Sequence, residues 1–284
     1  MLTTRRFLQM TGALAAGLVL AACGKKEEAP APTAAAPATP PAASAPPPPP
    51  AKVYAVGTDA AYAPFEFQNE KGEIVGLTVD LVTAVAAKAG IEVKFVNTPW
   101  EGIFNSLQQG DRDLLVSAIT ITEERRQSMD FTAPYFDAVQ LIAVRQNSPV
   151  TKFEDLKTLK VGVQTGTTGD EVVTQLLGKD STNVRRFEST PLALKELESG
   201  GVDAVVADNG VINHYVANNS TAAFKTVSDT SFAPEQYGIA VRKGNAELLD
   251  KLNQGLAAIR ADGTYDAIFT KYFGAPAAAP AASI

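Results

Sequence analysis

The sequence has few of the residues on which catalytic and metal sites depend. Its 284 residues include one cysteine, one histidine and one tryptophan. A single cysteine cannot form a disulfide within the chain. No cluster of histidine, cysteine and carboxylate residues has metal-site spacing, and the glycine-rich phosphate loop of P-loop proteins is missing. We therefore expect no metal and no cofactor. The lone His214, in "VINHYVANN", fits a partly exposed packing or capping residue better than a base or ligand.

Positive charge and a membrane-length apolar run are lacking as well. The formal net charge is −6, which argues against nucleic acid as a partner. The apolar run from Phe7 to Leu20 covers 14 residues, whereas a membrane-spanning helix needs roughly 20. The remaining composition, 45% hydrophobic and 20% charged, is that of an ordinary globular protein.

The first residues have the pattern of an export signal. Arg5 and Arg6 precede the apolar run, and small residues follow it up to Cys23. The ending "LAAC" resembles the lipobox of bacterial lipoproteins, so we expect cleavage after residue 22 and lipidation of Cys23. An unpaired thiol is the alternative. Export by the general secretory route and by the twin-arginine route both remain open.

A tether follows the signal. Residues 23–51 are rich in alanine and include ten prolines, a composition that favours extended polyproline geometry and a reach of up to roughly 80 Å. Loss of residues 1–22 removes two arginines and no acid, which changes the net charge to −8. Residues 274–284 have a similar composition, and we expect a disordered tail there.

The folded body is predicted between residues 52 and 273, and an internal repeat indicates two similar halves. The segments "SLQQGDRDLLVSAIT" and "ELESGGVDAVVADNG" begin at Ser106 and Glu196 and match at a 90-residue offset. Each reads as a helix end, a glycine turn and an apolar strand. A near-continuous apolar strand is typical of a parallel sheet covered on both faces. The matched pairs are Leu107 and Leu197, Gly110 and Gly200, Asp113 and Asp203, and Val116 and Val206.

These halves predict an α/β fold of two lobes, each a mainly parallel sheet flanked by helices and joined by two hinge strands. Lobe 1 is predicted at 52–141 and 237–273, and lobe 2 at 142–236. The runs "LIAVR" at 141–145 and "GIAVR" at 238–242 are candidate crossings. Amphipathic helices are expected at 78–89, 101–109, 170–177, 191–199 and 246–261. Ligands of such sheets bind beyond the carboxyl ends of the strands.

Two arginines near one such strand end are unusual. Arg125 and Arg126 follow Thr122 in "ITITEERR", close to the positive start of a predicted helix, where cations are unfavourable. Thr120 and Thr122 are both candidate N-caps. Either the arginines pair with the preceding glutamates on a solvated face, or one of them binds a carboxylate ligand.

A carboxylate at the end of a strand in the second half complements these arginines. Asp208 ends the apolar run "VDAVVAD". Its side chain either caps the next helix or binds an ammonium group. An arginine on one lobe and an aspartate on the other would together recognise a zwitterion.

Several segments carry a resemblance to a known family across residues 52–273. They include "TDAAYAPFEF", "PWEGIFNSLQQGDRDLLVSAITITEERRQSMDFTAPYF", "GTTGDE", "VDAVVAD" and "QYGIAV". The sequence resembles the polar amino-acid substrate-binding proteins of bacterial ABC transporters, which have the type II periplasmic binding fold. The resemblance implies that Arg125 binds the substrate α-carboxylate and Asp208 its α-ammonium group. The implied substrate-binding residues are Asp59, Tyr62, Trp100, Ser117, Ala118, Thr120, Arg125, Gln164, Thr168 and Asp208.

The resemblance also shapes the expected ligand. Asp59 is placed to pair with a cationic side chain, and Tyr62 with Trp100 to sandwich a guanidinium or amide group. We therefore expect a polar and preferably basic L-amino acid, captured outside the inner membrane and delivered to an ABC permease. The protein is expected to be a monomer, held at the membrane by a lipid on Cys23, and not an enzyme. The alternatives are an exported enzyme on the same fold, similar to cyclohexadienyl dehydratases, and a sensory module.

Overall fold

The first group of elements is built on a mixed five-stranded sheet with strand order β5-β1-β6-β15-β7. The computed structural model describes residues 52–219 and 223–274, so the predicted signal, Cys23, the tether and residues 275–284 lie outside the described residues. We call this group lobe 1. Its strands are β1 (Val53–Thr58), β5 (Glu92–Asn97), β6 (Leu114–Leu115), β7 (Met129–Phe131) and β15 (Ala240–Arg242), with a small sheet of β2 (Ala61–Tyr62), β3 (Glu66–Gln68) and β4 (Ile74–Val75). Its helices are α1 (Leu77–Ala89), α2 (Ile103–Gln109), α3 (Glu123–Ser128), α7 (Ala246–Ala261) and α8 (Thr264–Phe273).

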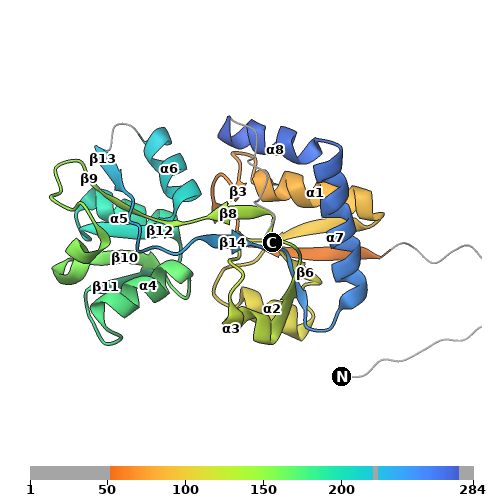
Figure 1. Ribbon diagram of the computed structural model, residues 1–284, viewed down its shortest axis with the longest axis horizontal. Helices are drawn as coiled ribbons and strands as arrows, with labels where there is room; N and C mark the ends of the chain where they lie inside the picture. The colour runs from red at the N-terminus through yellow and green to blue at the C-terminus, as the bar shows by residue number, and fades with distance from the viewer. Residues whose placement is uncertain (1–51, 220–222, 275–284) are drawn as a thin grey trace, which may run out of the picture. The chain divides into compact units, whose positions relative to one another are not determined.

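The second group, lobe 2, repeats this plan with strand order β11-β10-β12-β9-β13. In both sheet orders the first three strands are parallel to one another. Each of the last two strands pairs antiparallel with the strand before it. The strands are β9 (Gln140–Arg145), β10 (Val161–Gln164), β11 (Val184–Phe187), β12 (Ala204–Asp208) and β13 (Phe224–Val227). The helices are α4 (Thr168–Leu177), α5 (Thr190–Ser199), α6 (Asn209–Asn218) and the short 3-10 helix η1 (Phe153–Thr158). Figure 1 shows helices beside the sheet of each lobe, which confirms the predicted fold class.

Both faces of the lobe 2 sheet are buried, as its apolar strands predict. Ile142 and Val144 of β9 pack in one cluster, whereas Leu141 and Ala143 pack in another. Successive side chains of a strand point to opposite faces, so the two clusters lie on the two sides of the sheet. The apolar strand therefore needs helices on both sides.

The internal repeat has the same structure in each lobe. Gly110 and Gly200 end α2 and α5 in the left-handed conformation, both with φ of 89°, which glycine adopts without steric cost. The aspartates three residues later have equal roles: an Asp113 oxygen accepts from Ala55 N, and an Asp203 oxygen from Lys160 N, at 2.9 Å each. Each carboxylate thus ties the start of the repeated strand to its parallel neighbour, β1 in lobe 1 and the start of β10 in lobe 2.

The structure corrects the positions of the two crossings. The runs at 141–145 and 238–242 belong to the sheets, in β9 and β15. The chain passes between the lobes just before each run, through β8 (Phe136–Ala138) and β14 (Glu235–Tyr237), which pair antiparallel as a separate two-stranded sheet. Gln140 and Leu141, assigned to lobe 1 from the sequence, pair with Asp208 and Ala207 of β12.

Candidate functional site

One cavity brings together all ten residues that the sequence analysis selected. It lies between lobe 1 and lobe 2. Its walls come mainly from segments just past the strand ends, where parallel sheets bind ligands. The lining residues are Asp59, Tyr62, Trp100, Ser117, Ala118, Thr120, Arg125, Gln164, Thr168 and Asp208, together with Thr167.

Arg125 is a buried cation at one wall of this cavity. Thr122 is the N-cap of α3 and accepts from Arg125 N at 3.2 Å, which settles the choice between the two candidate caps. The Arg125 guanidinium donates to Thr120 O at 2.9 Å and lies 5.4 Å from the Trp100 ring centre and 5.2 Å from that of Phe104. Burial lowers the Arg125 pKa because desolvation disfavours the charged form. An anion at this wall would relieve that cost.

The two neighbouring arginines differ in their surroundings. Arg125 is 9% exposed, whereas Arg126 is exposed to solvent. Within the described residues neither arginine forms an ion pair, with Glu123 and Glu124 or with any other carboxylate. The reading of both arginines as one solvated face therefore fails for Arg125.

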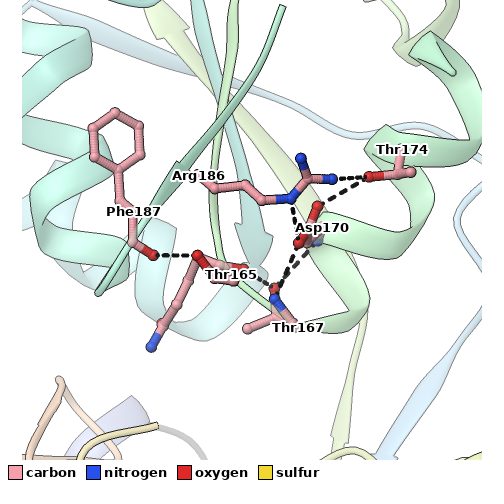
Figure 2. A network of polar contacts seen from close by, with 8 residues as sticks. Thr165, Thr167, Asp170, Thr174, Arg186 and Phe187 are labelled. Atoms are coloured by element: carbon pink, nitrogen blue, oxygen red, sulfur yellow. Dashed lines mark hydrogen bonds and ion pairs between the residues drawn. The ribbon is translucent and has the colours of Figure 1, made fainter. Parts of the chain in front are cut away.

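The start of α4 forms the facing wall and supplies backbone donors. Thr167 caps the helix by accepting from Asp170 N at 3.2 Å. The Asp170 carboxylate is held by Arg186 Nε at 2.9 Å, and Figure 2 shows this network beside the turn. In the part of the chain that the structure describes, the N–H groups of Thr168 and Gly169 have no acceptor. Free N–H groups at a helix start bind carboxylates.

Asp208 is the carboxylate on the lobe 2 side. It ends β12, is 6% exposed and accepts from Tyr62 Oη at 2.7 Å and Gln140 Nε2 at 2.6 Å. Burial raises its pKa to about 6, and the negative charge of Glu235 adds to the increase, whereas the hydrogen bond from Tyr62 opposes it. The Tyr62 bond also joins lobe 1 to lobe 2 directly. Asp208 makes no side-chain cap of α6, so the capping alternative fails.

Asp59 and Gln164 form a second link between the lobes. Gln164 Nε2 donates to an Asp59 oxygen at 3.2 Å, while Gln164 Oε1 accepts from Thr190 N at 3.3 Å and Thr190 Oγ1 at 3.0 Å. Burial raises the Asp59 pKa, and the Gln164 bond opposes that rise. The two bonds to Gln164 Oε1 fix the amide with its Nε2 toward Asp59, and this contact orients the carboxylate. The other Asp59 oxygen is free to bind a cation.

The backbone around Ala118 is strained at the cavity wall. Ala118 has φ of 44° and is 5% exposed, a conformation that residues with a Cβ seldom adopt. Next to it, Ser117 Oγ accepts from Asp59 N at 3.0 Å. Such strain concentrates at binding sites, and here it lies at a residue that the family resemblance assigns to substrate binding.

The predicted aromatic sandwich of Tyr62 and Trp100 has other contacts. The Trp100 ring lies against Arg125, and its plane is nearly perpendicular to that of Phe104, with 5.1 Å between ring centres. The Tyr62 hydroxyl is bonded to Asp208. Each ring thus contacts a charged group of the site while lining the cavity, and the sandwich of a ligand side chain between the two rings stays a prediction.

Two residues of the site were missed from the sequence. Gln140 Nε2 donates to Asp208 and also to Glu235 Oε1 at 2.9 Å. Glu235 Oε2 accepts from Thr120 Oγ1 at 2.5 Å and from Thr168 Oγ1 at 2.9 Å. Both residues lie beside the crossings, one at the start of β9 and one at the start of β14. Gln140 directly precedes the run at 141–145, whereas Glu235 lies three residues before the run at 238–242, so no shared sequence signal marks the two residues.

No group of three or more histidine, cysteine, aspartate and glutamate side chains in the described residues could hold a metal ion. His214 is half-buried, away from this cavity, and burial lowers its pKa.

Among residues 52–219 and 223–274, none of the helices combines the length and the apolar character needed to cross a membrane.

Comparisons with known proteins match nearly the whole described chain. The family model of bacterial extracellular solute-binding proteins, family 3, matches residues 54–275. The probable histidine-binding protein of Neisseria gonorrhoeae is 42% identical over 258 residues, covering 90% of this chain and 91% of the relative. The arginine-, lysine-, histidine-binding protein ArtJ of Geobacillus stearothermophilus matches with a TM-score of 0.77 and 44% identity, covering 80% and 97% of the two chains.

An ancestral amino-acid-binding protein described as a precursor of cyclohexadienyl dehydratase also matches, with a TM-score of 0.70 and 39% identity. It covers 78% of this chain and 95% of its own.

Proposed function

We propose, from the premise that this chain belongs to family 3 of the bacterial extracellular solute-binding proteins, that it captures a cationic L-amino acid and delivers it to an ABC permease. One observation carries the proposal: a buried arginine without a carboxylate partner among the described residues lines the same cavity as a buried aspartate on the other lobe. That pair of charges matches the two ends of an amino acid.

The carboxylate end of the ligand is assigned to Arg125 and the start of α4. Arg125 commits one nitrogen to Thr120 O, so the rest of the guanidinium is available for a bidentate contact. The N–H groups of Thr168 and Gly169 add two donors from lobe 2. The ligand would thus contact both lobes at once, and contacts made only in the closed arrangement favour closure.

The ammonium end is assigned to Asp208. Its two hydrogen bonds from Tyr62 and Gln140 hold the carboxylate in place and leave acceptor capacity, because an ionised carboxylate accepts about four bonds. A buried carboxylate is costly without a cationic partner. The ligand's ammonium group would supply that partner.

The side-chain end is assigned to Asp59, which favours a cationic residue. Gln164 donates to Asp59 and has its oxygen turned toward Thr190, so the amide offers no acceptor to a ligand. The remaining charge at that end is the Asp59 carboxylate. The relatives whose names specify histidine, or arginine, lysine and histidine, support the same choice.

A thermal melting panel of the purified chain with each of the twenty L-amino acids tests this function. Ligand at one hundred times its dissociation constant adds about 2.7 kcal/mol to stability, which for a body of this size raises Tm by roughly 5–10 °C. We expect shifts for arginine, lysine or histidine. If none of the twenty amino acids shifts Tm, amino-acid capture is wrong.

The Asp59→Asn variant tests the side-chain assignment. Loss of this charge should weaken binding of arginine or lysine by about tenfold and leave glutamine nearly unchanged. Gln68→Glu, a charge change on the exposed end of β3, is the control. An equal loss for cationic and neutral ligands in Asp59→Asn would refute a cationic side-chain subsite.

The proposed receptor has no catalytic role, although an ancestor of a dehydratase is among its structural matches. An enzyme that removes a hydroxyl needs an acid beside the leaving group, and Asp59, Asp208, Glu171 and Glu235 are carboxylates at or beside the cavity. Steady turnover of prephenate or arogenate by the purified chain would overturn the receptor-only proposal.

The location proposed for the protein is outside the cytoplasmic membrane, as for its extracellular family. We propose that Cys23 carries the lipid anchor and that residues 24–51 act as the tether. Cys23→Ser should release the protein from the membrane fraction, whereas Ser44→Ala in the tether should leave it membrane-bound. Unchanged membrane association of Cys23→Ser would refute the anchor.

A further inference from the structure

Glu235 lies beside the ligand cavity and is bonded to two of its lining residues, although neither strand-end reasoning nor family resemblance selected it. It starts β14, the crossing strand that runs from lobe 2 to lobe 1. Its side chain is the acceptor for three donors from three separate elements: Thr120 past β6, Thr168 at the start of α4, and Gln140 at the start of β9. Thr120 and Thr168 both line the ligand cavity.

The hydrogen-bond directions at Glu235 follow from the groups present. An ionised carboxylate only accepts, and a threonine hydroxyl has a single hydrogen. Thr120 Oγ1 lies 2.5 Å from Glu235 Oε2, and Thr168 Oγ1 lies 2.9 Å from the same oxygen. Both hydroxyl hydrogens are therefore directed at Glu235. What each hydroxyl can offer to a ligand is a lone pair.

The amide of Gln140 further restricts the hydrogen-bond directions around Glu235. Gln140 Nε2 has two hydrogens and lies near three acceptors: Asp208 at 2.6 Å, Glu235 at 2.9 Å and Thr168 Oγ1 at 3.2 Å. The two shortest contacts link the carboxylates of Asp208 and Glu235 through one amide. A cationic group beside Asp208 would therefore also lie in the field of Glu235.

We propose that Glu235 is a positioning residue of the amino-acid site, which takes the hydroxyl hydrogens of Thr120 and Thr168 and so presents both oxygens as acceptors to the ligand's α-ammonium group. This inference rests on the proposed function only in requiring an α-amino acid as ligand. An ammonium group has three N–H donors. Asp208 takes one of them, and the threonine oxygens are acceptors for the others. The ligand's carboxylate is left to Arg125 and the backbone N–H groups of α4.

The variant Glu235→Gln breaks this arrangement without changing the size of the side chain. An amide has one acceptor oxygen and one donor nitrogen, whereas three donors surround Glu235. Every orientation of the amide thus opposes an N–H to at least one of these donors. With its nitrogen at the Oε2 position, the amide opposes both hydroxyls, which then turn their hydrogens toward the cavity and the ammonium group. With its nitrogen at the Oε1 position, it opposes Gln140 Nε2 and disturbs the amide that holds Asp208.

The matched control is Asp137→Asn on the partner strand of the crossing. Asp137 is an exposed carboxylate of β8 that accepts from Gln236 Nε2 at 3.0 Å. This variant removes a carboxylate and weakens one hydrogen bond of the β8–β14 pair without touching the cavity. It reports what a merely structural change of the crossing does to binding.

The test is a double-mutant cycle in which one change is the loss of the Glu235 carboxylate and the other is the loss of the ligand's α-amino group. Affinities are measured by calorimetric titration. L-Arginine is compared with 5-guanidinopentanoic acid, which lacks the α-ammonium group, on wild type, Glu235→Gln and Asp137→Asn. We expect Glu235→Gln to weaken arginine by roughly tenfold and the analogue by less than twofold. Asp137→Asn should leave both unchanged. Equal losses for the two ligands, or no loss for arginine, would overturn the proposal.

If arginine, lysine and histidine fail to bind wild type, the cationic assignment is wrong, and the same cycle is run with whichever amino acid shifts Tm and its des-amino analogue. A crystal structure of the complex decides the case where an analogue binds too weakly. The proposal requires the ligand nitrogen within hydrogen-bond distance of Thr120 Oγ1, with Glu235 still bonded to that hydroxyl. A ligand carboxylate oxygen on Thr120 Oγ1, with Glu235 turned away, would contradict it.

Discussion

Acidification through pH 6 should weaken amino-acid binding, because Asp208 then takes up a proton. Burial, reinforced by the charge of Glu235, raises the Asp208 pKa to about 6. Only the ionised carboxylate pairs with an ammonium group. For arginine the ligand keeps its charges in this range, since α-carboxyl groups titrate near 3.5 and guanidinium groups above 12.

The size of the effect follows from the Asp208 pKa. At pH 7 about nine tenths of the Asp208 carboxylates are ionised, and at pH 5 about one tenth, so affinity should fall about tenfold over that interval. A ligand that needs the ionised form displaces the bound proton. At pH 6 binding should therefore release about half a proton per ligand.

Calorimetric titrations at pH 5, 6, 7 and 8, in buffers of different ionisation enthalpy, measure both quantities. Asp208→Asn should bind more weakly at every pH and lose most of the pH dependence. His214→Gln is the control, because His214 is the only histidine and lies outside the cavity. A flat profile for wild type between pH 5 and 7, or a profile that persists in Asp208→Asn, would refute the reasoning.

Two further predictions concern closure and stability. In Gly210→Ala the new Cβ would lie 2.7 Å from the Phe65 ring, where lobe 2 meets lobe 1. Ligand affinity should therefore fall roughly tenfold, while Tm is retained. Unchanged affinity would mean that this contact does not limit closure of the lobes. Glu66 is fully buried, and burial raises its pKa well above the usual value. The folded state therefore binds more protons than the unfolded state. The stability of the protein should fall as pH rises above the usual glutamate pKa near 4.3. Glu66→Gln should remove that slope and raise Tm at pH 8, measured by thermal melts from pH 5 to 8; a lower Tm at pH 8 would show that Glu66 is ionised.

Helices and repeated strands were predictable because their signals are local. Helix α7 has the predicted bounds, 246–261, and the glycine turns at 110 and 200 end helices as the repeat indicated. The crossings were misplaced because 141–145 and 238–242 are apolar runs like any sheet strand. Only pairing with distant strands distinguishes them from β8 and β14.

The candidate site divides in the same way. The ten predicted residues follow strand ends or family motifs, and one cavity holds them all; their roles in binding remain predictions. Glu235 and Gln140 carry no such signal, since their importance comes from three donors that meet only in the folded chain. The packing of Trp100 on the Arg125 guanidinium is likewise a contact that sequence spacing does not reveal.

The neighbouring arginines give the most direct test of an amino acid held between Arg125 and Asp208. Arg125→Ala and Arg126→Ala each remove one arginine from the same helix α3, but only Arg125 is buried at the cavity. The measurement is the dissociation constant of L-arginine, by calorimetric titration at pH 7.5, for wild type and both variants. We predict a loss of 100-fold or more for Arg125→Ala, on the order expected for breaking a buried charge pair, and less than about threefold for Arg126→Ala, as for a surface charge. Equal losses in the two variants, or tight binding by Arg125→Ala, would contradict the proposed site.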